Sequence, residues 1–181
     1  MKREDVLGLL YISCSNMRNR KAAGSYYTPT KIVRKAVDQL FRFNDEKGKL
    51  LDPCCGTGNF LLQLPDNIPM EQIYGSDINP VSVMIARINM ALRFFGCDVS
   101  MIERHIQVKD FLEVARRDSS SVQKGICQVI TDNTGEESYL DDMDFDYIIG
   151  NPPWGYNYSE QEKSELRTHF QCAMNAGFKV I

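Results

Sequence analysis

The chain has 181 residues, of which 43% are apolar and 25% charged, and its formal net charge is −3. This profile is typical of one globular domain with its own core, and no apolar run approaches the roughly 18–20 residues of a membrane-spanning helix. Glu4 and Asp5 interrupt the region where a secretory signal would be basic and then apolar. We therefore expect a cytoplasmic protein that does not act at a membrane.

The six cysteines form no Cys-x-x-Cys pair, and no paired histidines lie near them. Because such pairs supply the usual zinc ligands, we predict no metal site and reduced thiols. The two histidines, His105 and His169, are expected to face solvent or to pack rather than to catalyse.

The N-terminal half begins with two predicted helices. Residues 4–17 favour a helix with Val6, Leu9, Leu10 and Met17 on one side, and residues 16–25 read as a polar loop. Thr28 or Thr30 is expected to cap the second helix. Its apolar residues recur at helical spacing: Ile32, Val33, Ala36, Val37, Leu40 and Phe41.

Strands and helices then alternate. We predict strands at 49–51, 72–76, 105–108 and 147–149, and a helix that starts in 60–64. Pro80 opens a longer helix, because proline suits the first helical turn. The buried stripe of that helix is expected to be Met84, Ile88, Leu92 and Phe95. This order predicts a parallel, doubly wound α/β sheet. Residues 119–143 are expected to be an insertion, with 126–130 as one arm of a hairpin.

The first motif runs from Asp52 to Phe60 and contains Gly56 and Gly58, between a predicted strand and a helix. Glycines let such a turn approach a ligand closely, and Asp52 could accept hydrogen bonds from a bound amine. Asp77 ends the next strand, 25 residues later, near the offset at which an acid binds ribose hydroxyls in dinucleotide folds. The absence of a full Gly-x-Gly-x-x-Gly favours a nucleoside ligand without a pyrophosphate. A plain turn with a helix-capping acid remains the alternative.

The second motif is Asn151-Pro152-Pro153-Trp154, after the fourth strand. Prolines leave carbonyl groups without neighbouring donors. The side-chain oxygen of Asn151 beside such a carbonyl would provide two acceptors for a planar amino group, and Trp154 could stack on the ring that carries it. A structural loop corner is the alternative for this motif taken alone.

Together these motifs resemble the Rossmann-like adenine-N6 DNA methyltransferases of restriction–modification systems, and residues 24–29 resemble that family's N-terminal cofactor motif. The resemblance implies a class I methyltransferase fold, S-adenosylmethionine as cofactor and a prokaryotic source. It implies that Tyr27, Thr28 and Pro29 border the methionine part of the cofactor and that Asp52 binds its amino group. The remaining cofactor contacts that it implies are Asp77 (ribose), Ile78 and Asp110 (adenine), and Pro53, Gly56, Gly58, Phe60 and Phe111. Asn151, Pro152, Pro153 and Trp154 would receive the target adenine.

The chain supplies about four of the family's seven strands. We expect an N-terminal helix and loop over 1–23 and a truncated catalytic domain over 24–181, with an insertion near 117–145 and no activity in isolation. No Lys or Arg occurs in 125–162, where nine acids fall. DNA affinity rests largely on cationic contacts to phosphate, so we expect either that the partner is not nucleic acid or that the DNA-binding surface lies outside these 181 residues. A specificity or restriction subunit, or a fused domain, would be a further partner. A protein-glutamine or RNA-amine methyltransferase and a non-catalytic cofactor-binding module remain alternatives.

Overall fold

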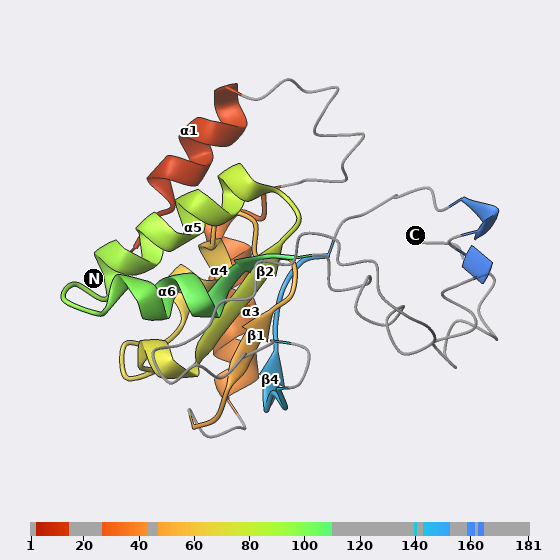
Figure 1. Ribbon diagram of the computed structural model, residues 1–181. Coiled ribbons are helices and arrows are strands. Elements are labelled where there is room, and N and C mark those ends of the chain that lie inside the picture. Colours follow the sequence, from red (N-terminus) through yellow and green to blue (C-terminus); the bar gives the residue numbers. More distant parts are fainter. Residues whose placement is uncertain are drawn as a thin grey trace.

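The computed structural model describes residues 3–14, 27–42, 47–109, 140, 143–152, 159–161 and 163–164. Its strands form one four-stranded sheet in the order β3-β2-β1-β4, and all three strand pairs are parallel (Figure 1). The predicted parallel α/β architecture is therefore confirmed. In chain order the elements are α1 (Val6–Cys14), α3 (Thr30–Phe41), β1 (Leu50–Asp52), α4 (Asn59–Gln63), the 3-10 helix η1 (Met70–Gln72), β2 (Ile73–Asp77), α5 (Pro80–Arg93), α6 (Val99–His105), β3 (Ile106–Val108) and β4 (Tyr147–Ile148).

Alternate strand residues separate two apolar clusters. Leu50, Ile73 and Ile106 are buried in the larger cluster, with side chains of α3, α4, α5 and α6. Leu51 and Tyr74, which follow Leu50 and Ile73, belong to a smaller cluster with Leu140, Met143 and Phe145. Successive residues of a strand point to opposite faces, so the two clusters lie on opposite faces of the sheet. The last part of the predicted insertion thus helps to cover the second face.

Helix α5 begins as predicted at Pro80, but its predicted buried stripe is wrong. Met84, Ile88, Leu92 and Phe95 are exposed, Phe95 to 96%, whereas Val83, Ala86 and Met90 are buried. Both sets recur at helical spacing, but at about 100° per residue their mean directions lie roughly 160° apart, on nearly opposite sides of the helix. The helix has apolar residues on more than one side, so its own periodicity could not decide which side faces the sheet.

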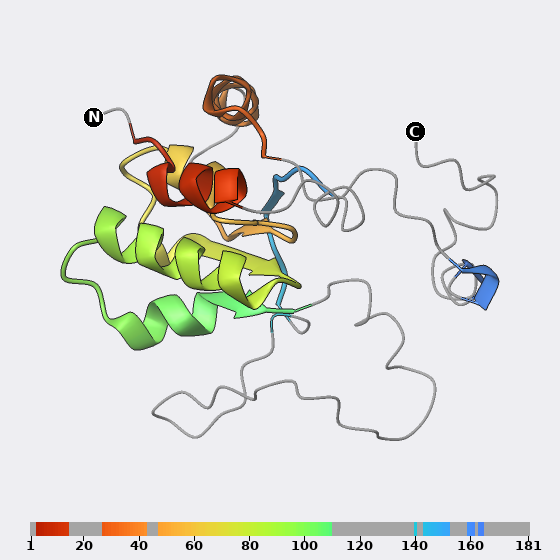
Figure 2. The same ribbon diagram turned by 90° about the horizontal axis from the view of Figure 1, so that it is seen from above.

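Two expectations for the N-terminal helices also need correction. Helix α1 spans Val6–Cys14, so it begins at Val6 rather than at residue 4, while residues 15–17 of the predicted helix lie outside the described residues; Val6, Leu9 and Leu10 are exposed. It lies beside α5 in Figure 1 and in the view from above in Figure 2. Neither Thr28 nor Thr30 caps α3: Pro29 precedes it without a side-chain cap, and both hydroxyl groups bond elsewhere.

Helix α6 was not predicted, and it takes His105 from the predicted third strand. The Asp98 side chain caps α6 by accepting from the Ser100 N–H. The His105 ring stacks on Tyr74 with ring centroids 4.2 Å apart, and burial lowers its pKa. His105 is therefore a packing residue, as expected.

Several sequence expectations fall outside the described residues. They are the loop at 16–25, the hairpin arm at 126–130 and His169. No helix in the described ranges is long and apolar enough to cross a membrane.

Candidate functional site: the carboxyl edge of the sheet

Three of the predicted site residues, Asp52, Asp77 and Asn151, lie where the strand order reverses. From β1 the chain passes to β2 and β3 on one side, and β4 then pairs with the other side of β1. In open parallel sheets, ligands bind beyond the carboxyl ends of the strands at such a switch point. Asp52 ends β1, Asp77 ends β2, and Gly150 and Asn151 follow β4 closely.

The glycine turn after β1 is bonded directly to the end of β2. Gly56 and Gly58 have φ of 53° and 88°, a region that favours glycine. The Gly56 N–H donates to Asp77 Oδ2 at 3.0 Å, and the Cys55 N–H donates to the Ser76 carbonyl at 2.8 Å. A Cβ at Gly58 would lie 3.3 Å from Ala86 Cβ, whereas one at Gly56 would meet no atom within 4 Å. Gly58 therefore packs on α5, and Gly56 faces open space.

Asp52 is a fully buried acid with one unsatisfied oxygen. Its Oδ1 accepts from the Cys54 N–H at 3.1 Å, while its Oδ2 is buried without a hydrogen-bond partner among the described residues. Burial raises the pKa of Asp52 to about 8, and the nearby charge of Asp77 adds to this, whereas the Cys54 hydrogen bond opposes it. A buried polar atom without a partner is costly, so Asp52 Oδ2 is suited to a ligand that brings a donor and a positive charge.

Asp77 is held from two sides and remains partly accessible. Its Oδ1 accepts from the Asn79 N–H at 2.8 Å, and Oδ2 takes the Gly56 N–H. Burial raises the pKa of Asp77, and these two N–H groups oppose the rise. Each carboxylate oxygen can accept a second hydrogen bond, so both retain capacity for hydroxyl donors. The next residue, Ile78, is 63% exposed, which leaves an apolar side chain beside this acid.

The second motif lies directly against the first. A Cβ on Gly150 would overlap Asp52 Oδ1 and lie 3.2 Å from Asp52 Cγ, so only glycine fits this contact without displacement. Asn151 Nδ2 donates to Thr28 Oγ1 at 3.0 Å, and the Thr28 carbonyl accepts from Asn59 Nδ2 at 2.8 Å. The amide oxygen of Asn151 lies at the opposite end of the group from Thr28.

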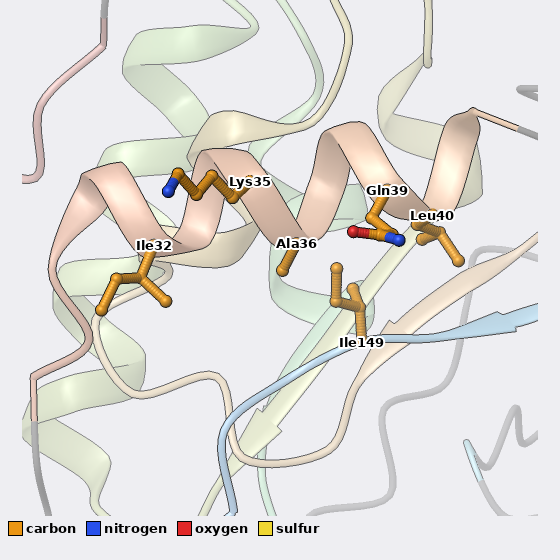
Figure 3. A pocket seen from close by; sticks show the side chains of 6 residues that line it. All are labelled: Ile32, Lys35, Ala36, Gln39, Leu40 and Ile149. Carbon is orange, nitrogen blue, oxygen red and sulfur yellow. The ribbon is translucent and has the colours of Figure 1, made fainter.

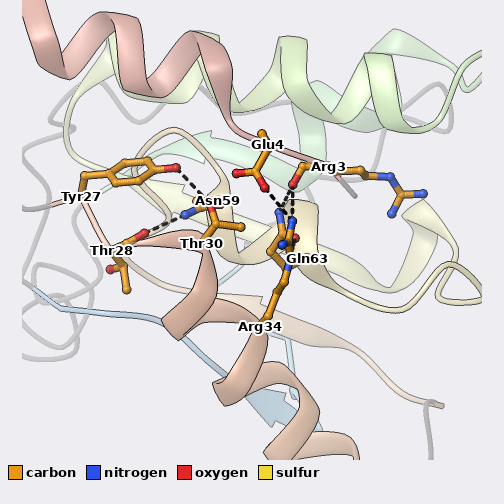
Figure 4. A network of polar contacts seen from close by, with 8 residues as sticks. All are labelled: Arg3, Glu4, Tyr27, Thr28, Thr30, Arg34, Asn59 and Gln63. Atoms are coloured by element: carbon orange, nitrogen blue, oxygen red, sulfur yellow. Dashed lines mark hydrogen bonds and ion pairs between the residues drawn. The ribbon is translucent and has the colours of Figure 1, made fainter. Parts of the chain in front are cut away.

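Thr28 and Asn59 have roles that the sequence did not reveal. Thr28 was expected beside the methionine part of the cofactor, and in the structure its hydroxyl oxygen also accepts from Asn151 Nδ2. Asn59 joins the N-terminal motif to the glycine turn, and Figure 4 shows its amide near Thr28 and Thr30. Asn59 directly follows Gly58 inside the first motif, but no local pattern indicates a bond across 31 residues.

The other predicted site residues are placed as follows. Tyr27 is half-buried with its hydroxyl 3.3 Å from that of Thr30, and Pro29 is exposed at the start of α3. The Pro53 carbonyl accepts from Ser76 Oγ, Phe60 lies in the larger apolar cluster, and Pro152 is exposed. Asp110, Phe111, Pro153 and Trp154 lie outside the described residues.

A separate groove of about 620 Å³ lies between α3 and the end of β4 (Figure 3). None of the predicted site residues lines it, and its walls are mainly apolar: Ile32, Lys35, Ala36, Gln39, Leu40 and Ile149. In the described ranges, no three His, Cys, Asp or Glu side chains are grouped so that they could hold a metal ion.

The sheet order, the glycine turn, the two strand-end acids and the adjoining Asn151 loop define a Rossmann-like methyltransferase fold, to which the described residues contribute four strands. Comparison with known protein families agrees: the family model described as "N-6 DNA Methylase" matches residues 2–177 of this chain. The chain belongs to this family.

Three relatives show how much of such proteins the chain represents. It is 31% identical over 144 residues to Type II methyltransferase M.VspI of Vibrio sp., covering 79% of this chain and 28% of that protein. It is 24% identical over 154 residues to the MjaIX methylase subunit, a Type I restriction enzyme component of Methanocaldococcus jannaschii, covering 81% and 21%. It is 33% identical over 105 residues to the Type I HindI methylase subunit of Haemophilus influenzae, covering 52% and 23%.

The chain thus spans about a quarter of the length of these relatives. Among solved structures, the cryo-EM structure of a DrdV–DNA complex matches with a TM-score of 0.46 and 26% identity, over 61% of this chain and 13% of that one.

Proposed function

We propose that this chain forms the cofactor pocket and part of the target-base pocket of an S-adenosylmethionine-dependent adenine-N6 DNA methyltransferase from a restriction–modification system. The unsatisfied, buried Asp52 Oδ2 beside the Asn151 loop carries the proposal. A cationic amine is the ligand group that this oxygen needs, and Gly56, in the turn that follows Asp52, faces open space. Names of relatives that are methyltransferases or methylase subunits of restriction enzymes support the same assignment.

The residues match two polar parts of S-adenosylmethionine, its amino group and its ribose hydroxyls. Asp52 would accept from the amino group, and the two oxygens of Asp77 would accept from the ribose hydroxyls. Ile78, exposed after Asp77, would pack against the adenine ring. Bound in this way, the cofactor would supply a sulfonium-activated methyl group.

Asn151 would tune the target nitrogen. The lone pair of an adenine amino group is delocalised into the ring, which makes the nitrogen a poor nucleophile. Thr28 holds the Asn151 amide by its nitrogen, so the amide oxygen and the Pro152 carbonyl would accept from the amino group. Two acceptors favour a pyramidal nitrogen and stabilise the positive charge that develops during transfer. The adenine must leave the duplex to reach them, at a cost of a few kcal/mol.

The 181-residue chain tests the cofactor assignment directly. Asp77→Ala removes charge-assisted hydrogen bonds worth about 1.5–3 kcal/mol each, so titration calorimetry should show S-adenosylmethionine affinity reduced by at least about tenfold. Asp98→Ala, which removes an exposed acid at the start of α6, is the matched control and should leave affinity unchanged. Equal affinity in wild type and Asp77→Ala would refute the ribose assignment.

The substrate is tested in the complete gene product that contains this chain. Labelled methyl transfer is compared on unmethylated duplex DNA, tRNA and release-factor protein, and the methylated product is identified. N6-methyladenine in DNA supports the proposal, whereas a methylated protein or RNA, or cofactor binding without transfer, assigns one of the alternatives. The 181-residue chain alone should bind DNA weakly because residues 125–162 lack Lys and Arg. Sub-micromolar binding in a gel-shift assay would contradict this.

A further inference from the structure

Asp5 is a fully buried carboxylate outside every predicted site motif. It precedes α1, and its Oδ1 accepts from the Gly8 N–H and from Asn89 Nδ2, both at 2.8 Å. Its Oδ2 accepts from the Thr57 hydroxyl. Burial of a carboxylate is costly unless hydrogen bonds satisfy it, and here both oxygens are satisfied. The partners come from the start of α1, from α5 and from the glycine turn.

Thr57, between Gly56 and Gly58 of the glycine turn, is hydrogen-bonded through both its side chain and its backbone. Its hydroxyl donates to Asp5, and its carbonyl accepts from Asn89 Nδ2 at 2.8 Å. The same Asn89 nitrogen also donates to Asp5. The three side chains, which we call the Asp5–Thr57–Asn89 triad, therefore close a small network, each member being 5% exposed or less.

Helix α1 approaches this turn too closely for an ordinary residue at position 8. A Cβ on Gly8 would overlap Asp5 Oδ2 and Thr57 Oγ1. The helix backbone therefore lies directly on the triad. The apolar side chains of Val6, Leu9 and Leu10 on α1 are exposed, so they bury little area against the domain. Polar contacts, rather than an apolar face, fasten this helix to the domain.

Residues 3–11 also make hydrogen bonds at two further points around the glycine turn. The Tyr11 hydroxyl accepts from Asn79 Nδ2 at 3.0 Å, and the Asn79 N–H donates to Asp77 Oδ1. On the other side, the Arg3 carbonyl accepts from Arg34 of α3 and from Gln63 of α4 (Figure 4). Residues 3–11 thus contact the elements on both sides of the turn.

We propose that the N-terminal helix α1 is part of the cofactor site, with Asp5 as a positioning residue that holds the glycine turn ready for the cofactor. The inference rests on the proposed function for the identity of the ligand. Two glycines give the turn wide conformational freedom, and ordering it upon binding would reduce affinity. Asp5 fixes Thr57, and with it the flanking Gly56 and Gly58, before the ligand arrives.

The following variants distinguish a role of Asp5 in positioning the glycine turn from a role in which Asp5 only anchors helix α1. Thr57→Val keeps the shape of the side chain but removes the hydroxyl that donates to Asp5. Thr57→Ser retains that hydroxyl and removes only the methyl group. Asp5→Asn changes the acceptor at Oδ2 with little change of volume. Glu4→Gln is the control, because it breaks an exposed ion pair to Arg34 in the same segment and leaves the triad intact.

For each variant we would measure S-adenosylmethionine affinity and amide hydrogen exchange, and its unfolding in urea. Thr57→Val and Asp5→Asn should each weaken S-adenosylmethionine binding about tenfold, as expected for a buried hydrogen-bonding group left without its partner. The double variant should lose little more than the larger single loss, since both break one contact. Hydrogen exchange of the Gly56 and Gly58 amides should become about tenfold faster without ligand. Thr57→Ser and Glu4→Gln should resemble wild type in both measurements.

The possible results distinguish this proposal from the proposed function. If the variants lower stability but leave amide exchange and cofactor affinity at wild-type values, Asp5 only fastens α1 and the positioning role is overturned. If wild type binds no S-adenosylmethionine while the variants still accelerate exchange at Gly56 and Gly58, the cofactor assignment fails and control of the turn by Asp5 stands. Should Asp5→Asn not fold, Thr57→Val compared with Thr57→Ser decides alone.

Discussion

Asp52→Asn should remove a pH-dependent penalty from the stability of the ligand-free protein. In the folded chain, burial raises the pKa of Asp52 to about 8, whereas an unfolded aspartate has a pKa of about 3.9. Between these values, the folded carboxyl holds a proton and the unfolded carboxyl has lost it. The free energy of unfolding must then fall as pH rises from about 4 to 8. Asparagine keeps the acceptor for the Cys54 N–H and carries no titrating proton.

The size of this effect follows from the same two pKa values. Each pKa unit corresponds to about 1.4 kcal/mol, so the difference sets an upper limit of about 6 kcal/mol for the wild-type penalty above pH 8. Local relaxation and water entry relieve part of the cost of a buried charge, so we expect about 2–4 kcal/mol. The variant should match wild type near pH 4 and become progressively more stable than wild type up to pH 8, after which the gap remains constant.

Urea unfolding at intervals from about pH 3 to 9 measures this gap. Asp98→Asn is the control of opposite sign, because hydrogen bonds from Ser100 lower the pKa of this exposed carboxyl. Asp98 stabilises wild type above the unfolded pKa, and this stabilisation is lost as pH falls through the folded pKa. Parallel stability curves for wild type and Asp52→Asn over the whole range would show that Asp52 is not a strained buried acid, and the argument for a cationic ligand would fail.

The remaining predictions concern the cofactor and base pockets. S-adenosylmethionine affinity of wild type should rise between pH 6 and 8, since Asp52 must lose its proton to accept the ammonium group; Asp52→Asn should bind weakly with no such rise in calorimetry. Gly150→Ala should lower the free energy of unfolding in urea by about 1–3 kcal/mol, because its Cβ overlaps the Asp52 carboxyl. In the complete gene product, Asn151→Ala should reduce single-turnover methyl transfer by ~100-fold or more with cofactor affinity unchanged; a wild-type rate would make the loop a structural corner. Trp154→Ala should weaken capture of the flipped base by about 1–3 kcal/mol, and Trp154→Phe should retain much of it.

Much of the carboxyl edge of the sheet could be predicted because it depends on local order along the chain. Asp52 and Asp77 each end a strand of a βαβ unit, and parallel strands bring their carboxyl ends to one edge. The glycine turn between β1 and α4 is likewise a local feature, in which Gly56 and Gly58 adopt the positive φ that glycine favours. Strand ends, turn glycines and their sequence separation therefore located the acids that the structure places together.

Contacts between distant segments could not be predicted in the same way. The helical spacing of α5 suits both Met84 and Val83 as core positions, and only packing against the sheet determined that Val83 is buried. The bond from Asn151 to Thr28 spans 123 residues, and no local pattern specifies it.

The amino-acid sequence by itself determined the parallel α/β class and the positions of the strand-end acids and glycines. These features follow from backbone preferences and hydrophobic periods within short windows. Only the tertiary structure decided which face of each helix is buried, that Asp52 lacks a partner for one oxygen, and that Asp5 binds Thr57 across 52 residues. Burial and hydrogen-bond satisfaction are properties of groups brought together from separate elements, so they arise only when those elements pack.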